Sequence, residues 1–142
     1  MAGVPFHYID LRAFCYATED ERRVRTALET FLPEDFEIDR VENEGFHGDR
    51  IVVLSARVEN ADGVRHVLDA LSGIDLDDIR TELDERIDEN CSLFLRLDKQ
   101  AAYGGYIERG AGIELRAKVE AYPAKKETAV ENAAEALSAR SE

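Results

Sequence analysis

The sequence contains few of the residues that most often hold metals or form disulfides. Its 142 residues include no tryptophan, one methionine, two cysteines and three histidines. Cys15 and Cys91 form no CxxC pair and have no neighbouring histidine, so we expect two reduced thiols in or near the core. The histidines are scattered and lack the spacing of metal ligands. These absences predict a protein without a metal site or a cofactor.

Long apolar runs are also missing. No stretch approaches the ~18 residues that a membrane span requires, and residues 1–5 lack the basic stretch and apolar core of a signal peptide. We therefore expect a cytoplasmic protein without membrane contact. Hydrophobic residues still make up 44% of the chain, too many for a disordered protein. The length suits one domain, which we place at 1–123, followed at 124–142 by an acidic, Ala/Glu-rich tail that is a frayed helix or disordered.

Sequence signatures of catalysis are absent. The chain has no GxGxxG, no Walker loop and no pairing of a nucleophile with a base. A nuclease would need carboxylates that converge on a metal ion. The acid-dense stretch 75–89 supplies many carboxylates, but on a helix most of them would face solvent. The sequence therefore predicts a binding protein and not an enzyme.

Lysine is scarce and negative charge is abundant. The chain has 4 Lys and 14 Arg against 31 acidic residues, a formal net charge of −13, and the acids are spread over most of its length. This composition resembles that of halophilic archaeal proteins. At ~1 M salt the Debye length is only ~3 Å, so the repulsion among surface carboxylates is screened. The alternative is an ordinary acidic domain that binds a basic partner.

Positive charge is concentrated in one segment. Residues 90–126 hold seven basic and four acidic groups, so this window carries +3 and the rest of the chain −16. In a strongly acidic protein, an asymmetry of this kind indicates an anionic partner.

Hydrophobic periodicity predicts an alternation of strands and helices. Alternating apolar residues favour strands at 6–17, 36–44, 51–58, 92–98 and 113–122. Apolar residues at helical spacing favour a helix that begins after Thr18, with Glu21 completing a capping box, a second helix capped by Asn60, and a third over 75–89. This order predicts an α+β fold: a two-layer, mostly antiparallel sheet with helices packed on one face.

The uncovered face of such a sheet, which we call the open face, should carry aromatic residues interleaved with cations. The alternation assigns to it Tyr8, Arg12, Phe14, Tyr16, Arg57, Phe94, Arg96, Arg116, Lys118 and Tyr122. Rings and guanidinium planes stack on bases, and cations contact phosphates, so the pattern favours RNA binding. The same residue types also suit a protein interface or a homodimer, which is the main alternative, and a plain solvated surface is the third.

The run LFLRLDKQAAYGG at 93–105 leads from a strand directly into a polar turn. Lys99 and Gln100 would place a cation and an amide at the rim of the sheet, and Tyr103 could add a stacking ring. A purely structural interpretation remains open: Asp98 caps a short helical turn, Arg86 pairs with a carboxylate, and Tyr103 fills the core.

The longer run RIDENCSLFLRLDKQAAYGG at 86–105 resembles the signature of an archaeal family of small RNA-binding proteins predicted to be exosome-associated subunits. YATED at 16–20, EGFHGD at 44–49 and AYP at 121–123 fit the same family, so the resemblance covers about residues 6–123. It implies a fold like that of double-stranded-RNA-binding domains, RNA as partner, and contact with the exosome or other RNA-processing proteins. We predict that RNA contacts Arg12, Phe14, Arg57, Phe94, Arg96, Lys99, Gln100, Tyr103, Arg116 and Lys118.

Overall fold

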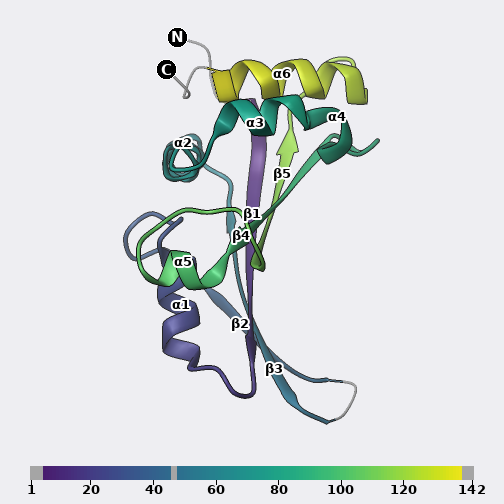
Figure 1. Ribbon diagram of the computed structural model, residues 1–142. Coiled ribbons are helices and arrows are strands. Elements are labelled where there is room, and N and C mark those ends of the chain that lie inside the picture. The colour runs from purple at the N-terminus through teal and green to yellow at the C-terminus, as the bar shows by residue number, and fades with distance from the viewer. Residues whose placement is uncertain (1–4, 46–47, 139–142) are drawn as a thin grey trace.

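The computed structural model describes residues 5–45 and 48–138, and it contains one five-stranded antiparallel sheet with order β2-β3-β1-β5-β4. Helices α1, α2 and α5 lie beside the sheet, and α3, α4 and α6 gather near one end of it (Figure 1). The predicted α+β fold is confirmed. The elements are β1 (Phe6–Tyr16), α1 (Glu21–Glu29), β2 (Asp39–Glu44), β3 (Arg50–Val58), α2 (Ala61–Leu71), α3 (Leu76–Thr81), α4 (Leu83–Arg86), β4 (Ser92–Asp98), α5 (Lys99–Tyr103), β5 (Gly112–Val119) and α6 (Lys126–Ser138).

Strand β1 is the centre of the sheet and pairs with β3 on one side and β5 on the other. Its alternate residues Ile9, Leu11 and Ala13 are fully buried under the helices, whereas Arg12 and Tyr16 are exposed on the open face. The period of two therefore assigned each side chain to the correct face. Among the described residues, no helix combines the length and the hydrophobicity that crossing a bilayer needs.

The helix caps agree with the sequence in one case and differ in another. The Asn60 side chain accepts a hydrogen bond from the backbone N–H of Gly63, as predicted for the start of α2. Helix α1 begins later than predicted, because Asp20 and not Thr18 is its N-cap and accepts from the N–H of Arg22. The Glu19 side chain explains the shift. Its carboxylate accepts a hydrogen bond from the backbone N–H of Tyr16, so residues 16–19 form a turn after β1 and the helix begins only after it.

The predicted helix over 75–89 is broken into α3 and α4. The break lies at Glu82, whose backbone N–H bonds the carbonyl of Ile79 three residues back, as in a 3₁₀ turn. Ile87 then leaves the helical conformation and pairs with Leu93 at the outer edge of β4. The apolar residues predicted for this segment are nevertheless buried, so the hydrophobic pattern was correct while the continuous helix was not.

The segment after residue 123, predicted as a frayed helix or a disordered tail, contains one helix in its described part. Residues 126–138 form α6, which packs on α3 through buried small side chains such as Ala129 and Ala133. The side-chain amide of Asn132 donates to the carbonyl of Glu120 at 2.7 Å, which ties the helix to the end of β5. The strands also differ slightly at their ends, since β2 begins at Asp39 and β5 ends at Val119.

Candidate nucleic-acid interface

Two neighbouring rows of side chains cross the open face from strand to strand. Cα pairing places Arg57, Asp10, Arg116 and Phe94 opposite one another on β3, β1, β5 and β4, and we call this set the first row. The second row is Asp39, Ser55, Arg12, Glu114 and Arg96; its members on β3, β1, β5 and β4 lie two residues from those of the first row, and Asp39 adds β2. Together the rows alternate cations with carboxylates and end at β4 in an aromatic ring and an arginine.

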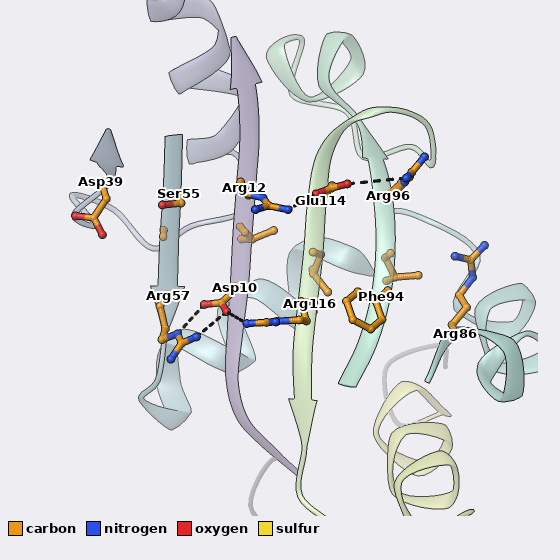
Figure 2. A pocket seen from close by; sticks show the side chains of 14 residues that line it. Asp10, Arg12, Asp39, Ser55, Arg57, Arg86, Phe94, Arg96, Glu114 and Arg116 are labelled. Atoms are coloured by element: carbon orange, nitrogen blue, oxygen red, sulfur yellow. Dashed lines mark hydrogen bonds and ion pairs between the residues drawn. The ribbon is translucent and has the colours of Figure 1, made fainter. Parts of the chain in front are cut away.

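Asp10 organises the first row. Its two carboxylate oxygens accept hydrogen bonds from Arg57 Nε at 2.7 Å and Arg57 Nη2 at 2.9 Å, and Oδ2 also accepts from Arg116 Nη2 at 3.1 Å (Figure 2). Burial alone would raise the pKa of Asp10, but the hydrogen bonds from Arg57 and Arg116 outweigh it and hold the pKa below its usual range. The Arg57 guanidinium also lies 4.0 Å from the ring centroid of Tyr8. Both arginines are thus held in fixed positions.

Glu114 has the same role in the second row. It accepts from Arg12 Nη2 at 2.7 Å, and Arg12 also lies 5.2 Å from the ring centroid of Phe14. Arg96, on the other side of Glu114, is only within 4.0 Å of the carboxylate and its side chain is 73% exposed. Arg96 is therefore the least constrained guanidinium of the two rows.

The rows line a hollow of about 770 Å³ on the open face (Figure 2). Phe94 stands at one side of it with 44% of its surface exposed, next to Arg116 and one pleat away from Arg96. An aromatic ring and a weakly constrained guanidinium on the same side of one strand form a platform on which planar groups can stack.

The three residues predicted at the rim have different environments. Lys99 is buried: its Nζ donates to the carbonyl of Phe14 at 2.7 Å and to Glu19 Oε1 at 2.6 Å. The expectation that Lys99 offers a free cation at the rim is therefore corrected. Gln100 and Tyr103 are exposed, and the 44% exposed Tyr103 does not fill the core. Asp98 caps α5 through the N–H of Ala101, as the structural interpretation predicted.

Two further predictions concern residues at the edges of this region. Arg86 pairs with Glu82, as expected. Lys118 is half-buried and its Nζ donates to the carbonyl of Asn90, so it contributes less free charge than the sequence suggested. Tyr122, which lies beyond the end of β5, is 86% exposed.

The model of a protein family described as RNA binding matches residues 8–119. The chain belongs to this RNA-binding family. It is 38% identical to the RNA-binding protein PAB1135 of Pyrococcus abyssi, over 92% of this chain and 93% of that protein. An uncharacterized protein of Methanocaldococcus jannaschii, MJ0213, is 33% identical over 68% of this chain and 71% of its own length. The structure of Mth689, a DUF54 protein from Methanothermobacter thermautotrophicus, has a TM-score of 0.81 and 41% identity, covering 93% of this chain and 98% of that one.

Membership of the RNA-binding family confirms the RNA-binding part of the resemblance that the sequence motifs suggested. One of those motifs, EGFHGD, contains Phe46 and His47, which lie outside the described residues. Within residues 5–45 and 48–138 no group of three or more His, Cys, Asp or Glu side chains could hold a metal ion. Cys15 and Cys91 are free and buried, as predicted.

Sequence reasoning missed Asp10 and Glu114, the two carboxylates that fix the arginines. A signal was present, because the alternation along β1 and β5 places them on the same face as Arg12 and Arg116. What the sequence does not contain is the cross-strand register that makes Asp10 the neighbour of both Arg57 and Arg116. Without the register, each acid looks like one more surface carboxylate in an acidic protein.

Proposed function

We propose that this protein binds RNA without cleaving it, and that the open face of its sheet contacts the bases. The observation that carries the proposal is the pair of Phe94 and Arg96 on β4, an exposed ring beside an exposed and weakly constrained guanidinium over a hollow of about 770 Å³. Membership of the RNA-binding family and the name of the Pyrococcus abyssi relative support it.

The ion pairs of the two rows favour base contact over phosphate contact. Arg57, Arg116 and Arg12 are already bound to Asp10 and Glu114, so a phosphate would have to compete with a carboxylate for each of them. The carboxylates would also repel a phosphate that approached the centre of the face. Bases avoid both difficulties, since their faces stack on rings and guanidinium planes, and a carboxylate can accept from an exocyclic amino group or a 2′-hydroxyl.

The proposal is tested by fluorescence anisotropy with a labelled RNA hairpin and a labelled single-stranded RNA. Stacking on an aromatic side chain contributes ~1–3 kcal/mol per base, so Phe94→Ala should weaken binding by roughly 5- to 150-fold. We expect a loss in the same range for Arg96→Ala. Arg65→Ala is the matched control, because Arg65 is a partly exposed arginine of α2 that pairs with Asp62 and does not line the hollow of the open face. Wild-type affinity in both open-face variants would overturn the assignment of base contact to this face.

Light scattering on the same samples tests the competing use of this face. If it were a protein interface, the wild type would be a dimer and the variant Phe14→Ala/Arg96→Ala a monomer. A wild-type dimer of this kind without RNA binding at any salt concentration would assign the open face to self-association.

We further propose that the protein is a cytoplasmic accessory factor of RNA processing or degradation that associates with the exosome. This part is supported by the resemblance of the run at 86–105 to exosome-associated proteins. A pull-down from native lysate in high salt, analysed for RNA and for protein, tests it. Recovery of RNA without any exosome subunit would contradict the exosome association and leave RNA binding intact.

A further inference from the structure

Three arginines on one helix differ from the other arginines of the molecule. Arg22, Arg23 and Arg25 are exposed on α1, and none of them forms an ion pair within the described residues. Every other described arginine has a carboxylate oxygen within 4.0 Å. In a chain with 31 acidic residues, three arginines without an ion pair among the described residues set α1 apart.

The position of these arginines is also unfavourable for the helix itself. They lie in the first five residues of α1, where the helix dipole disfavours positive charge. Arg22 and Arg25 are three residues apart, so two like charges are neighbours on the same surface. Glu21, four residues before Arg25, offsets part of this cost, although its carboxylate also pairs with Arg40. Helix stability therefore does not explain Arg22 and Arg23, whereas an anionic ligand would.

Neighbouring groups on α5 complete a binding surface. The guanidinium of Arg23 lies 5.5 Å from the ring centroid of Tyr103, and both residues line a hollow of about 330 Å³ together with Thr18 and Gln100. Two acids also line this hollow, but both have structural partners. Glu19 is bonded to Lys99 and the Tyr16 N–H, and the Asp20 carboxylate caps α1.

We propose that this surface binds the sugar-phosphate backbone of the RNA. We call it the α1 face and define it by Arg22, Arg23, Arg25, Gln100 and Tyr103. The inference rests on the proposed RNA-binding function and adds a second surface to it. A guanidinium without a carboxylate can form two parallel hydrogen bonds to a phosphate without breaking an existing ion pair. Gln100 can donate to and accept from a 2′-hydroxyl, and Tyr103 offers a ring.

The α1 face adjoins the open face at the end of β1. Lys99, the first residue of α5, bonds the carbonyl of Phe14 and lies 5.1 Å from the ring centroid of Tyr16. Phe14 and Tyr16 belong to the open face, and Thr18 of the second hollow follows two residues later. One RNA strand can thus place bases on the open face and continue with its backbone along α1.

The experiment compares two double variants that change the net charge equally. Arg22→Ala/Arg25→Ala removes two unpaired cations from the α1 face. Arg65→Ala/Arg80→Ala removes two paired cations from α2 and α3 and is the control. Affinity for a labelled RNA hairpin is measured over the KCl range in which circular dichroism shows every protein folded. The logarithm of the binding constant falls with the logarithm of the salt concentration, and each lost phosphate contact makes this negative slope shallower by about 0.7–0.9. We therefore expect the slope of the α1 variant to be shallower than that of the wild type by about 1.5, and the slope of the control to be unchanged.

The outcomes separate this inference from the proposed function. A slope and an affinity equal to those of the control would overturn the α1 face, while a loss in Phe94→Ala would keep base contact on the open face. If the α1 variant loses slope and the open-face variants bind normally, the α1 face stands and base contact on the sheet is contradicted. A wild type that binds no RNA at any salt concentration would overturn both.

Discussion

Replacing Lys99 by methionine is expected to destabilise the fold. It should remove no cation from either of the proposed RNA-binding surfaces. Only 9% of the Lys99 side chain is exposed, and its ammonium bonds both Glu19 and the Phe14 carbonyl. Methionine fills a similar volume but cannot donate to either group. The substitution therefore isolates the contribution of these two hydrogen bonds.

The size of the effect follows from the burial of the two partners. Removing one member of a buried ion pair costs about 3–5 kcal/mol. Glu19 keeps 22% of its side chain exposed and also accepts from the N–H of Tyr16 at 3.1 Å, so water and the backbone compensate in part. We expect a loss of about 2–3 kcal/mol in the free energy of unfolding. For a domain of this size, that loss of stability lowers the Tm by roughly 6–12 °C.

The pH dependence of the loss gives a second signature. Burial alone would raise the pKa of Glu19, but the hydrogen bonds from Lys99 and the Tyr16 N–H outweigh it and lower the pKa. A lowered pKa in the folded state stabilises the protein above the unfolded-state pKa of about 4.3, and this stabilisation disappears as the pH falls through the folded-state value. The difference in the free energy of unfolding between the wild type and Lys99→Met should therefore shrink as the pH drops below the pKa of the unfolded-state carboxyl group.

Thermal unfolding followed by circular dichroism at a fixed KCl concentration measures both effects. Lys125→Met is the matched control, because Lys125 is exposed and makes no ion pair within the described residues; it should change the free energy of unfolding by no more than about 0.5 kcal/mol. Equal Tm values for Lys99→Met and Lys125→Met would refute the structural role of Lys99.

Three other properties can be predicted. Because the chain carries −13, it should lose secondary structure in dilute buffer and regain it in molar KCl; unchanged circular dichroism across this range would contradict the halophilic interpretation. Hydrogen bonds from Arg109 and Arg86 lower the pKa of Glu82 to about 2. The stabilisation of the fold by ionised Glu82 is therefore complete above the ordinary pKa of a glutamate and fades as the pH falls toward 2. Glu82→Gln should make acid unfolding less steep in that window. Finally, the protein should not cleave labelled RNA, and metal-dependent cleavage that is abolished by carboxylate substitutions would refute this.

The parts of the fold that depend on local periodicity could be predicted from the sequence. The alternation in β1 determines that Ile9 and Leu11 face the helices and Arg12 faces solvent, and no distant residue changes that. Lys99 could not be placed in this way. A lysine that follows Asp98 at the end of a strand looks like a surface residue, and its burial depends on Glu19, which is 80 positions away.

The break between α3 and α4 was unpredictable for the same reason. The apolar spacing over 75–89 fits one helix, and the local sequence contains neither glycine nor proline to interrupt it. The helix is nevertheless interrupted at Glu82, and the chain leaves it altogether at Ile87, which pairs with Leu93 at the edge of β4. Tertiary pairing of this kind overrides local helix propensity, and only the structure reveals it.

The division between paired and unpaired arginines gives the two proposed surfaces different responses to salt. On the open face, Asp10 and Glu114 already pair with Arg57, Arg116 and Arg12, so fewer counterions are released there when RNA binds than around unpaired arginines. Stacking and hydrogen bonds to bases would then persist in concentrated salt. The arginines of α1 form no ion pair in the part of the chain that the structure describes, and their contacts with phosphates should weaken as salt rises. In a chain of net charge −13, the proposed division of labour is that the α1 cluster attracts an RNA and the paired rows retain it when electrostatic attraction is screened.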